Sequence, residues 1–159
     1  MKSKRTGSLI EKLERGLMKS LEIFIALNDR QWNQVIYPEG GWTMRDLLAH
    51  FIYSEEHLLD VAKDIAAGGP GAPEELDLDA FNREQLERFE KASPGDLLQQ
   101  MRDARQATIK WVRGLREGTL DLEGRHPALG IVNLETLLLS IYGHQLLHMR
   151  EITPLIRNA

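Results

Sequence analysis

The chain has 159 residues, no cysteine and a formal net charge of −4. The missing cysteines exclude disulfides, thiolate ligands and a cysteine nucleophile, and the acidic balance gives no support to nucleic-acid binding. The sequence has no run of about 20 apolar residues, and its basic segment 1–16 lacks the apolar core of a secretory signal. We therefore expect a cytoplasmic protein without a membrane span, folded as a single domain over residues 1–159.

The first predicted helix covers residues from about 6 to 28. Apolar side chains recur there at every third or fourth position, which is the spacing of an amphipathic helix. The segment 33–41 loses this periodicity and contains Pro38, Gly40 and Gly41, so we predict a loop. The apolar positions of the helix are Ile10, Leu13, Leu17, Leu21 and Phe24.

The second predicted helix begins with a capping box, with Thr43 as the N-cap and Asp46 in the return position. It ends near Ala67, before a Gly/Pro-rich connection over residues 68–78. Glu55 falls in the middle of its apolar stripe, and His50 lies at the stripe's edge. A carboxylate in that place indicates either a polar cavity or a wet end of the helix.

The remaining segments predict a short helix at about 79–91 and a long helix from Pro94 to about Arg116, capped by Ser93. Residues 119–133 are predicted to be a loop, and Asn133 can cap a last helix that reaches Pro154 or slightly beyond. No strand-like alternation persists long enough to predict a sheet. The fold class is therefore all-α, a four-helix bundle with one short extra helix between helices 2 and 3, whose connectivity remains open.

Histidines carry the predicted chemistry. His144 and His148 are four residues apart, so a helix places them on one face, where they can hold one metal ion. His50 is the candidate third ligand, and three imidazoles leave an open position for water or substrate. His57 lies two turns, or roughly 10 Å, beyond His50 and cannot easily join the same ion. The pair alone also fits two polar residues at a helix seam, because Gln145 replaces the glutamate of the HExxH motif.

Three segments of the chain resemble the DinB/YfiT-like superfamily, in order and at suitable separations. The family pattern has a tryptophan before the second helix, a histidine following an aspartate, and HxxxH in the last helix. His50, His144 and His148 match these three ligand positions without substitution. The segments are WTMRDLLAH at Trp42–His50, GRHPALG at Gly124–Gly130 and YGHQLLHMREI at Tyr142–Ile152.

The resemblance implies a four-helix bundle, a homodimer, and a divalent metal such as zinc or nickel on the three histidines. It also implies a small-molecule substrate and a thiol-dependent S-transferase or isomerase that acts on electrophiles in detoxification or stress response. The metal would hold a low-molecular-weight thiol as the thiolate, which attacks the electrophile. Glu55 and His57 are the candidate catalytic residues, each as a group that positions a proton or part of the substrate.

Two alternatives from other classes stay open. In the first, the protein is a hydrolase that acts on small molecules or adducts through metal-bound hydroxide and needs no thiol. In the second, it is a non-catalytic metal-binding bundle of the stress response, in which the histidines hold a structural ion or none; a closing fourth ligand from a carboxylate such as Glu55 would favour this alternative. The sequence leaves the metal's identity and the substrate undecided, because three imidazoles suit several transition metals.

Overall fold

The computed structural model describes residues 4–157 and confirms the predicted all-α four-helix bundle. Two short helices, α2 (Asp29–Trp32) and α4 (Leu78–Glu87), and a 3₁₀ helix, η1 (Glu117–Asp121), lie in the connections. No helix in the described part of the chain combines the length and apolar character needed to span a membrane. The four long helices are α1 (Lys4–Ile25), α3 (Met44–Ala66), α5 (Pro94–Arg113) and α6 (Leu134–Arg157).

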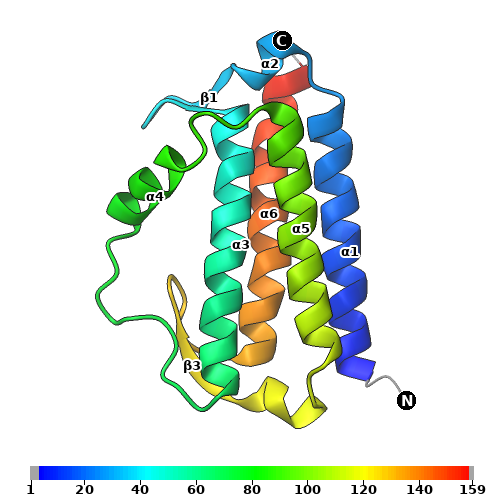
Figure 1. Ribbon diagram of the computed structural model, residues 1–159, viewed down its shortest axis with the longest axis vertical. Helices are drawn as coiled ribbons and strands as arrows, with labels where there is room; N and C mark the ends of the chain where they lie inside the picture. Colours follow the sequence, from blue (N-terminus) through cyan, green and yellow to red (C-terminus); the bar gives the residue numbers. More distant parts are fainter. Residues whose placement is uncertain (1–3, 158–159) are drawn as a thin grey trace.

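The connection between α3 and α5 is a crossover, which answers the question that the sequence left open. Helices α3 and α5 pack side by side and run in the same direction, because residues 67–93 return the chain along the outside of the bundle (Figure 1). Each of α1 and α3 packs against both α5 and α6, so α1 and α3 occupy opposite corners. The short helix α4 stands outside the bundle beside α3.

Two small antiparallel hairpins replace segments that the sequence pattern predicted to be loops. Strands β1 (Val35–Tyr37) and β2 (Trp42–Thr43) pair before α3, and β3 (Glu123–His126) pairs with β4 (Gly130–Asn133) before α6. These strands have two to four residues. Such lengths are too short for a period-two pattern to stand out, so the expectation of no strands was wrong at this scale.

A tight backbone contact ties the crossover to the second hairpin. The Ala72 N–H donates to the Arg125 carbonyl, and the Arg125 N–H donates to the Pro70 carbonyl, both at 2.8 Å. Gly71 lies between these bonds with φ +86°, and an added Cβ would come within 2.6 Å of the Arg125 backbone. Only glycine fits this approach. The contact holds the turn of the β3–β4 hairpin beside α3 and α6.

Helix starts follow the predicted caps. Thr43 and Ser93 each accept a hydrogen bond from the backbone N–H of an aspartate three residues later, and each aspartate side chain accepts in return. The Asn133 side chain accepts from Thr136 N–H at 2.8 Å at the start of α6. Because caps fix where each helix begins, they also fix which residues face the interior.

The buried ion pair between Arg105 and Glu55 links all four long helices. Arg105 on α5 is 0% exposed and donates to both oxygens of Glu55 on α3, at 2.6 and 3.0 Å. It also donates to the Leu13 carbonyl of α1 at 2.5 Å and to the Gln145 side chain of α6 at 2.8 Å. Glu55 can lie in the apolar stripe of α3, because the guanidinium of Arg105 on α5 donates to its carboxylate inside the bundle.

Removing the charge of Glu55 is expected to destabilise the fold strongly. Glu55→Gln leaves Arg105 charged and buried without its counter-ion, which costs about 3–5 kcal/mol of unfolding free energy. Glu56→Gln is the matched control, because the neighbouring Glu56 forms only a half-exposed pair with Arg88 at 3.4 Å and should lose less than about 1 kcal/mol.

Urea denaturation of both variants measures the difference, and the double variant Glu55→Leu/Arg105→Met should recover most of the loss. Equal stabilities of the two glutamine variants would contradict a central role for the ion pair.

Candidate metal centre

Three histidines converge where α3 faces α6. His50 lies on α3, and His144 and His148 follow each other by one turn on α6. The Nε2 atom of His144 is 2.9 Å from Nε2 of His50 and 3.1 Å from Nε2 of His148. One ring nitrogen from each histidine lies within 4.8 Å of the other two. The structure thus brings together the three residues that the sequence predicted as ligands.

A tyrosine fixes the orientation of His50. The Tyr53 hydroxyl donates to Asn82 Oδ1 at 2.9 Å, so its oxygen is available to accept from His50 Nδ1 at 2.8 Å. This arrangement puts the ring proton on Nδ1 and leaves the Nε2 lone pair facing the other histidines. The indole of Trp42 packs on the same ring, with the two centroids 4.9 Å apart.

A second tyrosine does the same for His148. The Tyr37 hydroxyl donates to Glu151 in a short hydrogen bond, and its oxygen lies 2.7 Å from His148 Nδ1. Nδ1 of His148 therefore donates to Tyr37, and its Nε2 is left with a lone pair. Metal-ligating histidines commonly have such a partner on the remote nitrogen, which fixes the tautomer and raises ligand basicity.

All three imidazoles are held in the neutral form that metal binding needs. Burial lowers the pKa of His144 to about 4, with His148 and His126 contributing repulsion. Burial, followed by repulsion from His144 and His148, lowers the pKa of His50 further. The pKa of His148 is also lowered by burial, and Glu151 partly offsets this effect.

The nitrogen triangle fits a single divalent ion. Zinc–imidazole bonds of about 2.0–2.1 Å in a tetrahedron separate the ligand nitrogens by about 3.3 Å, close to the 2.9 and 3.1 Å that separate His144 Nε2 from the other two Nε2 atoms. Three converging lone pairs repel one another, and one proton on His144 can satisfy only one of its two neighbours. A cation at their centre satisfies all three, so the donor set fits zinc, nickel or another transition metal.

A cavity of about 500 Å³ opens beside His50 and His144. Its walls come from α3, α4, the turn of the β3–β4 hairpin and α6. Among residues 4–157, no lysine, arginine, aspartate or glutamate side chain lines it. The polar lining consists of histidines and neutral side chains, and the apolar walls include Leu58, Leu78, Phe81, Leu129 and Leu147.

The candidate catalytic residues His57 and Glu55 differ in their position relative to this cavity. His57 lines the cavity about two turns from His50, with its ring 4.8 Å from that of Phe81. His126, which we left outside the predicted site, also lines the cavity and donates from Nε2 to Ser140 at 2.9 Å. Glu55 does not line the cavity, because both its oxygens bind Arg105. We propose a structural role for Glu55 in place of the expected catalytic one.

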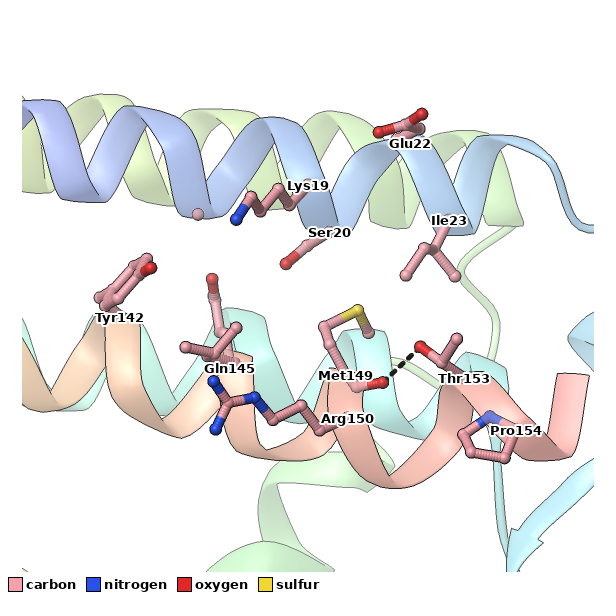
Figure 2. A pocket seen from close by; sticks show the side chains of 12 residues that line it. Lys19, Ser20, Glu22, Ile23, Tyr142, Gln145, Met149, Arg150, Thr153 and Pro154 are labelled. Carbon is pink, nitrogen blue, oxygen red and sulfur yellow. Dashed lines mark hydrogen bonds between the residues drawn. The ribbon is translucent and has the colours of Figure 1, made fainter.

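A second hollow lies between α1 and α6 and has a different character. Figure 2 shows Lys19, Ser20 and Ile23 of α1 facing Gln145 and other residues of α6 across a groove. The groove shares no lining residue with the histidine cavity, and it includes charged side chains on both helices. The uncharged lining is therefore a property of the hollow next to the histidines and not of the molecule's surface in general.

Sequence reasoning missed the groups that orient the ligands. Tyr53 and Glu151 each stand three residues after a ligand histidine, so helical spacing could have indicated both. Tyr37 meets His148 across 111 positions of the chain, through a hairpin that the pattern did not predict. No local signal in the sequence indicates that contact.

Comparisons with known proteins agree with this architecture. A family model of the DinB superfamily matches residues 12–152. The solved structure of YfiT from Bacillus subtilis, described as a probable metal-dependent hydrolase with an unusual four-helix bundle topology, is similar with a TM-score of 0.77. The match has 24% sequence identity and covers 98% of this chain and 89% of that chain, which establishes a shared fold. A comparison with curated proteins found no match.

The tyrosine that orients His50 should contribute to metal affinity. Tyr53→Phe removes the closer of two acceptors for His50 Nδ1, leaving Ser54 Oγ at 3.3 Å, and should weaken zinc binding about 10-fold, as for other partners of metal-bound histidines. Competition with a chromogenic chelator measures the affinity. Tyr142→Phe, in the α1–α6 groove, is the matched control, and equal zinc affinities for the two variants would contradict the assignment.

Proposed function

The chain belongs to the DinB superfamily, and on that basis we propose that it is a metal-dependent enzyme that hydrolyses a small uncharged molecule. The observation that supports this most directly is the position of the three-histidine cluster at the wall of a cavity without charged side chains. A divalent ion held there would supply Lewis acidity, for activation of water or polarisation of an electrophile. YfiT from Bacillus subtilis, described as a probable metal-dependent hydrolase, agrees with this class.

The residues around the cluster favour an open site over a closed structural one. No aspartate or glutamate in the described chain joins the group of three histidines as a further ligand. Glu55, the carboxylate considered for that role, is bound to Arg105. A three-ligand set beside a cavity is the arrangement of catalytic zinc sites, whereas structural sites are closed by four protein ligands.

The uncharged lining of the cavity favours a substrate without a net charge. Away from the metal, a charged group would lose its hydration there without gaining an oppositely charged side chain, which is costly. Apolar walls instead favour a compact, largely apolar molecule, whose reactive group faces His50 and His144.

A thiol-dependent transferase is the second candidate. The cavity volume of about 500 Å³ leaves room for two small reactants, and the chain itself supplies no thiol. The uncharged lining favours a neutral thiol, because a carboxylate on the cosubstrate would find no lysine or arginine in the cavity once the thiol sulfur occupies the metal. We place hydrolysis first for this reason.

Zinc-loaded protein is expected to hydrolyse 4-nitrophenyl acetate at least tenfold more efficiently than mono-4-nitrophenyl succinate, because the succinate brings an unpaired negative charge. Release of nitrophenol, corrected for the uncatalysed reaction, gives kcat/KM for each ester. The acid product should carry ¹⁸O when the reaction is run in labelled water, and His144→Ala should abolish the catalysed rate.

Added 2-mercaptoethanol separates the two candidates. A hydrolase shows no thiol dependence, whereas a transferase forms the thioester and requires the thiol. Turnover only with the thiol would contradict hydrolysis, and a preference for the succinate ester would contradict the argument from charge.

A further inference from the structure

The histidine cavity contains one buried polar atom that the fold leaves without a partner. Among the side-chain nitrogen and oxygen atoms buried within residues 4–157, only Nε2 of His57 lacks a hydrogen bond. Native proteins rarely bury such an atom without a reason, because it loses its contact with water and gains nothing in return. The residue lines the cavity, so a bound molecule can supply the missing partner.

The two histidines His126 and His57 line the same cavity but differ in whether the protein supplies hydrogen-bond partners for their ring nitrogens. Nδ1 of His126 accepts from the backbone N–H groups of Ala128 and Leu129, and its Nε2 donates to Ser140. Both nitrogens of His126 are therefore occupied by the protein. His57 packs its ring against Phe81, and its Nε2 has no partner from the protein.

The separation of His50 and His57 along α3 indicates how long a molecule must be to contact both residues. His57 follows His50 by seven residues, which places it roughly 10 Å farther along the helix axis. Both histidines line the cavity. The reactive end of a molecule at His50 and its other end at His57 are thus separated by the length of a substituted benzene ring with a short side chain.

We propose that His57 is the positioning residue of the cavity, which hydrogen-bonds the far end of an uncharged, largely apolar substrate that carries one hydroxyl, carbonyl or amide group. The substrate's other end reacts beside His50 and His144, and in this respect the inference rests on the proposed function. The single polar group selects the substrate's orientation, because the apolar walls offer it few other partners. Neutral aromatic alcohols and their relatives fit this description.

The test uses p-cresol and p-xylene, two probes of the same shape that differ in one hydroxyl group. The five histidines of the chain give a simple spectrum after ¹⁵N labelling, so the ring of His57 can be followed by NMR in the metal-free protein. We expect p-cresol to shift the Nε2 signal of His57 and to bind at least fivefold more tightly than p-xylene. His57→Leu should remove this preference without weakening p-xylene, and His57→Gln should restore part of it.

A glycine in the cavity wall shows where the probes bind. Gly143 lines the cavity, and a Cβ added there would meet nothing within 4 Å, so the backbone admits a side chain and Gly143→Leu takes up cavity space. Gly7→Leu is the matched control, because Gly7 also lies in a long helix and is equally open. We expect Gly143→Leu to exclude both probes and Gly7→Leu to bind them as the wild type does.

Equal affinities for p-cresol and p-xylene in the wild type would overturn the proposal, and so would an unchanged preference in His57→Leu. Failure of both probes to bind, or binding that Gly143→Leu does not affect, would show that the cavity takes no such ligand. Because these measurements need neither metal nor turnover, they separate an error about His57 from an error about hydrolysis. An inactive protein with the expected p-cresol preference would overturn only the proposed function.

Discussion

The burial of Arg105 is the constraint on which the rest of the structure depends. A guanidinium keeps its charge in proteins, so a side chain with no exposed surface needs partners for its N–H groups. These partners come from α1, α3 and α6, which fixes the three helices relative to α5. Two of them are neighbours of the histidines, because Glu55 follows His50 by five residues and Gln145 follows His144 directly. The register that satisfies Arg105 therefore also sets how the ligand histidines face one another.

The elements outside the bundle hold the tyrosines that orient two histidines and form walls of the cavity beside them. The β1–β2 hairpin brings Tyr37 to His148, and α4 brings Asn82 to the tyrosine that orients His50. The same α4 and the turn of the second hairpin form the outer walls of the cavity. Helices α3 and α6 thus supply the three imidazoles, whereas the connections build the outer walls of the cavity beside them. The crossover makes this possible, because it carries residues 67–93 along the open side of α3 (Figure 1).

The sequence predicted what local periodicity and short motifs encode. The helices, their caps and the grouping of His50, His144 and His148 follow from spacing and from the family resemblance. The carboxylate of Glu55 in the apolar stripe was interpreted as a sign of a polar cavity or a wet end of the bundle, whereas its partner is the buried Arg105, 50 positions away on α5. Its identity depends on α3 and α5 being neighbours, which the open connectivity could not show. The hairpins were missed because a few residues cannot display a period of two, and Tyr37 was missed with them.

The metal content of the purified protein is the most direct test of the three-histidine centre. Mass spectrometry of the metals should find about one divalent ion per chain in the wild type and in His57→Ala, whose imidazole lies outside the ligand triangle. His148→Ala should lose the ion, because two imidazoles alone hold it weakly. No metal in the wild type after incubation with zinc and nickel would contradict the account, as would an undiminished metal content in His148→Ala.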